Sequence, residues 1–133
     1  MPEHSTLINT IAELSKPYFP ELPLDLARSL VMRMAQKGVG FAHITQVENQ
    51  PQLEFVYESD KALVDVTYRA QMWNETLILK SRITGVGVNR GPDATTLVIW
   101  TAGGMKLSYT ASGPYQKGLQ AFSEYMQRSL FVA

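Results

Sequence analysis

The fold follows from the stretch 62-ALVDVTYRAQM-72, in which apolar and polar residues alternate. Alternation with a period of two over this length predicts a β-strand with one buried face. The apolar positions of this face are Val64, Val66, Tyr68, Ala70 and Met72. We take this strand as the first of four in an antiparallel meander that runs to Ala111.

A turn at Trp73–Glu75 and a second strand over 76–83 are expected next, because asparagine in the middle of this turn tolerates its geometry. In this arrangement Met72 lies opposite Leu77, so that apolar positions match on the two strands. A shift by one residue would move charged side chains to the buried face. The pattern therefore favours this register.

A second hairpin is expected from strands over 94–101 and 105–111. The intervening Ala102-Gly103-Gly104 is typical of a tight turn, because glycine adopts positive φ at little steric cost. Pairing across this turn places Ile99 opposite Leu107 and sets one apolar face toward the core. The other face of the same strand then carries Val98 and Trp100.

The segment 84–93 joins the two hairpins. Its first half continues the preceding strand, and Gly85 and Gly87 allow a bulge or a bend there. Its second half contains Gly91-Pro92, which is typical of a turn or a protruding loop. Two further strands, over 39–48 and 52–58, are expected before the meander.

Helices are expected at both ends of the chain. The first begins at Ser5 or Thr6 and ends near Ser15, and the second runs from Leu24 or Asp25 to Lys37 with Gly38 as its cap. The last follows Pro114, and its apolar stripe consists of Tyr115, Leu119, Phe122, Met126 and Leu130.

These elements predict an α+β fold. It has two N-terminal helices, an antiparallel meander sheet of about six strands, and a C-terminal helix packed on one sheet face. With 133 residues the chain is long enough for one domain, which we assign to residues 1–133.

Composition limits the function. The chain has no cysteine, which fits a reducing compartment, and its twelve basic residues equal its twelve acidic ones. Zero net charge disfavours a nucleic-acid partner. No apolar run reaches the ~18–20 residues that span a bilayer, and the first residues lack the pattern of a signal peptide. We therefore expect a cytoplasmic protein with no membrane partner.

The outer face of the predicted sheet is unusually apolar for a face turned away from the core. Exposed apolar patches mark contacts, and aromatic and arginine side chains are their usual anchors. A non-enzymatic binding module is the function we predict, with a second copy of the chain or another protein as its partner. The expected interaction surface consists of Trp100, Val98, Ile78, Arg69, Arg82 and Trp73. The alternative for this face is coverage by the two N-terminal helices.

A small apolar ligand between sheet and last helix is the alternative function. The element order resembles that of helix-grip lipid-binding folds, which hold an apolar ligand against their last helix, although the leading strand of those folds is missing here. The cavity would be lined by Tyr57, Tyr68, Tyr109 and Phe122. Phe41 is expected on the same face as Phe55. An ordinary filled core explains the same pattern.

Catalytic and metal-binding patterns have little support. There are two histidines, and only His43 falls within a predicted element. An active site would need His43 to be reachable and bonded to a carboxylate. Glu54 and Glu58 are too far apart along a strand for a glycosidase pair. We predict no catalytic residue, no metal site and no cofactor. Arg90, with Arg82, Arg69 and Lys80, is explained by solvated turns and cross-strand charge pairs as well as by an anion site.

Overall fold

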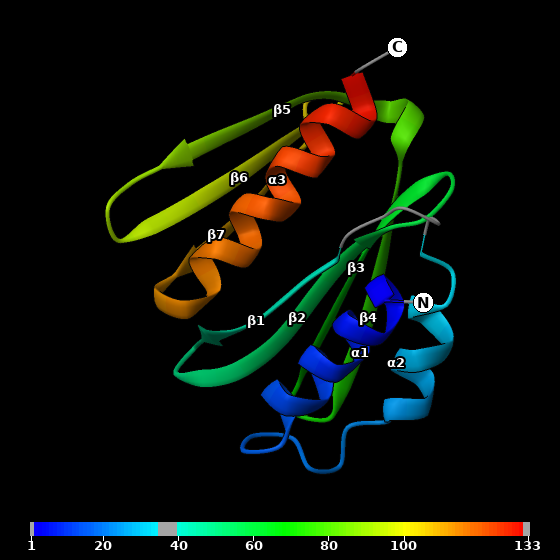
Figure 1. Ribbon diagram of the computed structural model, residues 1–133, viewed down its shortest axis with the longest axis vertical. Coiled ribbons are helices and arrows are strands. Elements are labelled where there is room, and N and C mark those ends of the chain that lie inside the picture. Colours follow the sequence, from blue (N-terminus) through cyan, green and yellow to red (C-terminus); the bar gives the residue numbers. More distant parts are fainter. Residues whose placement is uncertain (1, 35–39, 132–133) are drawn as a thin grey trace. The chain divides into compact units, whose positions relative to one another are not determined.

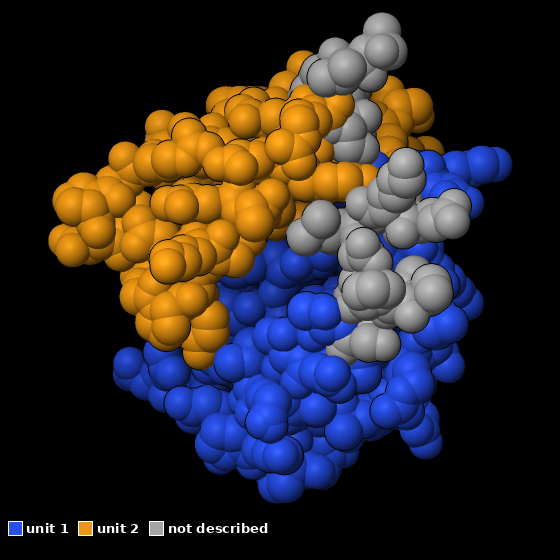
Figure 2. Space-filling view, in the orientation of Figure 1, with its two compact units in different colours: residues 1–77 blue, residues 78–133 orange. Residues whose placement is uncertain are grey.

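The computed structural model describes residues 2–34 and 40–131 of the chain. These residues form helices and strands with two short 3-10 turns, η1 and η2 (Figure 1). They divide into two compact units, residues 1–77 (unit 1) and 78–133 (unit 2) (Figure 2). The elements are α1 (Pro2–Ser15), α2 (Leu24–Val31), β1 (Gly40–Val47), β2 (Gln50–Glu58), β3 (Ala62–Arg69), β4 (Met72–Leu79), η1 (Lys80–Arg82), β5 (Ile83–Arg90), β6 (Ala94–Thr101), β7 (Lys106–Ser112), η2 (Gly113–Tyr115) and α3 (Gln116–Phe131).

The α+β class is confirmed, with two N-terminal helices, antiparallel sheets and a C-terminal helix on a sheet. The strands form two sheets and not a single meander: one has the order β1-β2-β3-β4 and the other β5-β6-β7. The predicted strand over 76–83 is interrupted by η1, in which no residue is buried. Continuing the ladder through these three polar residues would bury no apolar surface, so nothing favours a continuous strand here.

The first hairpin of the meander turns earlier than predicted. Its loop is Ala70-Gln71, where φ is 52° and 63°, and Met72 already belongs to β4 together with Leu77. The predicted pairing of Met72 with Leu77 is therefore wrong. A two-residue loop with positive φ at both positions matches the twist of the flanking strands.

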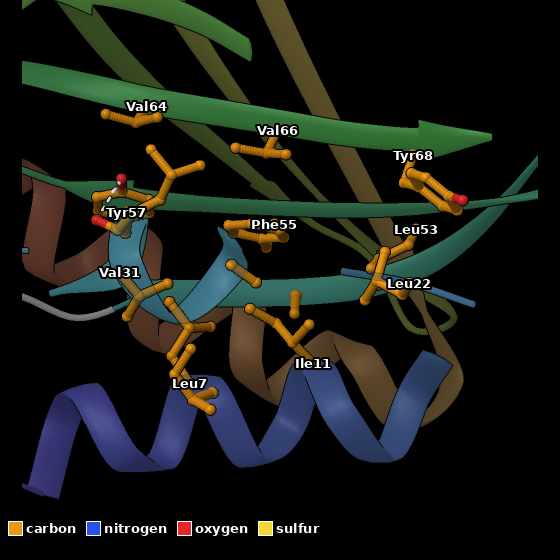
Figure 3. Close-up of a cluster of buried hydrophobic side chains, with 14 of the residues drawn as sticks. Leu7, Ile11, Leu22, Val31, Leu53, Phe55, Tyr57, Val64, Val66 and Tyr68 are labelled. Carbon is orange, nitrogen blue, oxygen red and sulfur yellow. Dashed lines mark hydrogen bonds between the residues drawn. The ribbon is translucent and has the colours of Figure 1, made fainter. Parts of the chain in front are cut away.

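The core of unit 1 lies between α1, α2 and one face of the four-stranded sheet (Figure 3). The strands contribute Leu53, Phe55, Tyr57, Val64, Val66 and Tyr68 to this core, and the helices contribute Leu7, Ile8, Ile11, Ala27, Leu30 and Val31. Strand register explains the set, since Phe55 pairs with Ala42 on β1 and Val66 on β3. The expectation that Phe41 shares this face is wrong, because Phe41 pairs with Val56 and lies on the opposite face.

The second helix is shorter than predicted. It ends at Val31, and Met34 instead forms an isolated antiparallel bridge with Ser59. The predicted end at Lys37 and the cap at Gly38 lie outside the described residues. The helix still buries its apolar stripe on the sheet, where the backbone carbonyl of Leu30 accepts a hydrogen bond from the Tyr57 hydroxyl at 2.7 Å.

Unit 2 consists of the three-stranded sheet with α3 packed against it. The predicted pairing of Ile99 with Leu107 is confirmed, as is the turn, in which Gly103 and Gly104 have φ of 93° and 87°. The side chains between this sheet and the helix are fully buried: Leu97 and Ile99 from β6, and Leu119, Phe122 and Met126 from α3. Gln120 adds a hydrogen bond from its amide nitrogen to the Thr95 hydroxyl at 3.0 Å.

Candidate interaction surface

The face of the three-stranded sheet that points away from α3 holds the main candidate site. We call it the outer face. Its members follow from strand register: Gly85, Gly87 and Asn89 on β5; Ala94, Thr96, Val98 and Trp100 on β6; and Lys106, Ser108, Thr110 and Ser112 on β7. Alternation of side chains along each strand places these residues together. Trp100 is 44% exposed and is its largest apolar side chain.

The Trp100 indole lies on the backbone of the neighbouring strand β5. A Cβ built on Gly87 would be 3.1 Å from two carbons of the ring, and one on Gly85 would be 3.3 Å from a third. Glycine at both positions therefore lets the ring approach the strand closely. The register shifts between Ile83 and Gly85, which is consistent with the predicted bulge or bend, and both glycines lie alongside the tryptophan. One side of the ring is thus packed while the side chain remains substantially open to solvent.

One lysine and several hydroxyl groups share the outer face with the ring. Lys106 is the cross-strand partner of Trp100 on β7 and is exposed. The hydroxyls of Thr96 and Thr110 are 3.0 Å apart and form a hydrogen bond across the same face. Arg82 is exposed at the same end of the sheet, where its backbone carbonyl accepts a hydrogen bond from Ala102 at 2.7 Å. The outer face is therefore uncharged except for Lys106, and Arg82 is exposed beside the same end of the sheet.

The other residues of the predicted surface lie in different surroundings. Ile78 and Val98 are buried, and Trp100 and Arg82 are exposed. Arg69 is half-buried at the end of β3 in unit 1. Trp73 packs against the unit 1 core, with its ring 6.1 Å from that of Phe55 and 6.3 Å from that of Tyr68, and its N–H donates to Glu75 at 2.8 Å. The six residues therefore do not share the single outer face that one continuous sheet would have given them.

Trp100 was predictable from the sequence, but its neighbours on the outer face were not. Gly85 and Gly87 predict a bulge or a bend, and nothing in their spacing indicates that a ring lies on them. Lys106, Ser108 and Thr110 are polar positions of the predicted strand over 105–111. Their alternation with Leu107 and Tyr109 was the available signal, because it already placed them opposite the core.

The proposed cavity residues belong to two separate units. Tyr57 and Tyr68 lie in unit 1, in the core under α1 and α2, whereas Tyr109 and Phe122 are buried in unit 2. The Tyr68 hydroxyl donates to the Glu21 carboxylate at 3.0 Å. The alternative function as a carrier of an apolar ligand stays a prediction, and this distribution adds no support to it.

Burial changes the acidity of both core tyrosines. It raises the pKa of Tyr57 to about 12, with a smaller lowering effect from Arg33 and a raising effect from Glu75. It also raises the pKa of Tyr68, to which the hydrogen bond and the negative charge of Glu21 add. Both hydroxyls therefore remain protonated at neutral pH and act as hydrogen-bond donors within the fold.

His43 satisfies one half of the condition for an active site. Its Nε2 atom is 2.9 Å from Glu54 Oε1 on the paired strand, so it has a carboxylate partner. The side chain is nevertheless buried, with a ring contact to Phe41 at 4.7 Å. A buried histidine bonded across two strands is explained by packing and hydrogen bonding alone. Within residues 2–34 and 40–131, no group of three or more His, Cys, Asp or Glu side chains could hold a metal ion.

No protein-family model matches the sequence, and no curated protein matches it. In the described part of the chain, no helix is long and apolar enough to cross a membrane. The proposals below therefore depend on the geometry and charge of the residues themselves.

Proposed function

We propose that this protein is a non-enzymatic binding module that self-associates through the outer face of its three-stranded sheet. The observation that carries the proposal is Trp100, held against Gly85 and Gly87 and still 44% exposed. We place the protein in the cytoplasm, because the absence of cysteine fits a reducing compartment.

A fixed aromatic ring is well suited to binding. The glycine backbone beneath Trp100 restricts its motion before any partner arrives, so association costs less side-chain entropy. Tryptophan is a typical anchor of a protein interface. Ser108, one outer-face register pair along from Trp100, is short, and so are Thr96 and Thr110 farther along the face, so a partner surface can approach it closely.

Mass in solution tests this proposal. We expect the natural protein to be a dimer by light scattering on a size-exclusion column, and Trp100→Ala to shift the mass toward a monomer. Because Trp100→Ala also uncovers the glycines, Ser108→Glu is a second variant that leaves the ring in place. It introduces a charge at an exposed position opposite Val98 in the middle of the face.

Gln127→Glu is the matched control, since it adds the same charge to an exposed position of α3. It should leave the dimer intact. A second apolar surface gives a further comparison: Met72, Leu77 and Leu79 are exposed on β4, which is an edge strand. A monomeric natural protein, or a dimer that only Leu77→Lys dissociates, would overturn the proposal.

A further inference from the structure

The zero net charge of the chain conceals an unequal distribution. Unit 1 contains ten acidic and six basic residues, whereas unit 2 contains two acidic and six basic residues. The formal charges are therefore −4 and +4, with histidine neutral. The net charge of the whole chain does not show this division. It affects which partners the protein can bind, because the sign of the local charge selects which surfaces approach one another.

The positive charge of unit 2 extends to the outer face. Lys106 on this face and Arg82 in η1, at the same end of the sheet, are exposed, and no carboxylate belongs to the three outer-face strand rows. The two acidic residues of unit 2 lie elsewhere. Glu124 is on α3, where it forms an ion pair with Arg90 at 3.3 Å, and Asp93 is in the turn between β5 and β6. An approaching acidic surface would therefore meet attraction at this face.

Unit 1 carries the excess of acidic residues that such attraction requires. Two of its basic side chains lie beside acidic neighbours, in the pairs Lys16–Glu13 and Arg28–Asp25, each at 3.1 Å. Exposed acidic side chains also occur in the hairpin turns: Glu48 between β1 and β2, and Asp60 between β2 and β3. The excess of carboxylates makes unit 1 the acidic complement of unit 2.

We infer that the outer face of unit 2 binds the acidic unit 1 of a second copy of this chain. The inference rests on the proposed self-association and adds to it the surface that is bound and the force that selects it. Charge attraction brings the basic outer face toward the acidic unit, and Trp100 supplies the apolar contact once water is excluded. Like-charged orientations, unit 1 on unit 1 or unit 2 on unit 2, are repelled.

Salt dependence is the first test. The Debye length is about 10 Å at 0.1 M ionic strength and falls to about 3 Å at 1 M, so salt screens attraction between exposed charges. We expect the dimer dissociation constant of the full chain, measured by sedimentation equilibrium, to rise by roughly tenfold or more across this range. A dissociation constant that stays constant or falls would overturn the inference, because apolar contacts are not weakened by salt.

A matched pair of double variants locates the charge. Arg82→Glu/Lys106→Glu reverses the cation of the outer face and the one beside it in η1, and Lys117→Glu/Arg128→Glu makes the same change in net charge at exposed positions of α3. We expect the first variant to be monomeric and the second to remain a dimer. Equal weakening by both would show that only total charge matters and would overturn the inference.

A mixing experiment tests whether unit 1 of the second copy is the partner. Glu48→Lys/Asp60→Lys reverses two exposed charges of unit 1 and should weaken self-association. Mixed with Arg82→Glu/Lys106→Glu, it should form a heterodimer that is tighter than the homodimer of either variant. A dimer that Trp100→Ala dissociates, but that neither salt nor charge reversal affects, would end this inference and leave the proposed function standing. A chain that is monomeric under all conditions would end both.

Discussion

The two tryptophans of this chain show how differently its two sheets treat a large side chain. Trp73 is on β4, where it packs beside Phe55 and Tyr68 at the edge of a core that two helices cover. Trp100 is on β6, where it packs on the backbone of two glycines and keeps 44% of its surface exposed. The ring of Trp73 contacts other side chains, whereas the ring of Trp100 lies on the backbone of two residues that have no side chain.

This contrast separates stability from binding. On the covered face of the four-stranded sheet, each apolar side chain removes surface from water and contributes to folding. On the outer face of the three-stranded sheet, the residues beside Trp100 are Gly85, Val98 and Lys106, of which only Val98 is a buried apolar side chain. The covered face therefore holds unit 1 together, while the outer face leaves an aromatic ring available to a partner. The following predictions test this difference.

The largest effect is expected on the covered face. Phe55 is fully buried in the unit 1 core, so Phe55→Ala should lower the free energy of unfolding by about 3–5 kcal/mol, through lost burial and a residual cavity. Urea unfolding followed by circular dichroism measures this change. Met32→Ala, at an exposed apolar position beside α2, should stay within about 0.5 kcal/mol. Similar losses for both would contradict the assignment of Phe55 to the core.

A smaller effect is expected where Trp100 meets β5. Gly87→Val places a branched side chain where the ring lies, since even a Cβ would be 3.1 Å from two ring carbons. We expect a loss of about 1–3 kcal/mol and a red shift of the Trp100 emission, measured in a Trp73→Phe background. In Gly87→Val/Trp100→Ala the clash is gone, so the two losses should not add. Additive losses would show that the ring does not lie on Gly87.

Local signals made part of this structure predictable. Gly103-Gly104 carries its turn signal within the sequence, and the β6–β7 register follows from it. Ala70-Gln71 carries no such signal, and the alternation of apolar residues runs through it, so the turn was placed too late. As a result, the side chains that point toward α1 and α2 have even numbers on β3, as Tyr68 does, and an odd number at Trp73 on β4. This change cannot be read from alternation alone.

The candidate site was predictable only in part, for a related reason. Alternation on β6 placed Trp100 away from the core, and the structure finds it exposed. Its support by Gly85 and Gly87 depends on how β5 pairs with β6 after the bulge, which is a contact between strands and not a local pattern. The 3-10 turn at Lys80–Arg82, which interrupts the predicted strand, likewise depends on whether the strands pair into one sheet or two. Long-range pairing decides both features.

Alkaline pH should act on the covered face through Tyr57. Its pKa is raised from 10.0 to about 12 in the folded protein. Below pH 10 the folded and unfolded chains both keep this proton, and its contribution to stability is complete. Between pH 10 and about 12 the unfolded chain releases the proton first, so stability falls as pH rises. Tyr57→Phe should make urea unfolding less dependent on pH in this window.

Tyr57→Phe also removes the hydrogen bond to the Leu30 carbonyl, so it should cost about 1 kcal/mol at neutral pH. Tyr68, whose pKa is raised as well, keeps part of the pH dependence in this variant. Tyr18→Phe, at an exposed tyrosine, is the control. A pH dependence that is the same in Tyr57→Phe and the natural protein would show that Tyr57 ionises equally in both states.

The smallest effect is expected at the ion pair that joins β5 to α3. Arg90 and Glu124 are 3.3 Å apart, and both side chains are about half exposed, at 48% and 55%. Because solvent screens the charges and two long side chains lose entropy, such a pair contributes only about 0–1 kcal/mol to the free energy of unfolding. Arg90→Ala should therefore lower the free energy of unfolding by less than about 0.5 kcal/mol, and added salt should remove the difference.

Thr95→Val is the informative comparison. It removes the fully buried hydroxyl on β6 that accepts the hydrogen bond from the Gln120 amide. If Arg90→Ala proved the more costly of the two, the helix would be held on its sheet by surface charge and not by the core around Phe122.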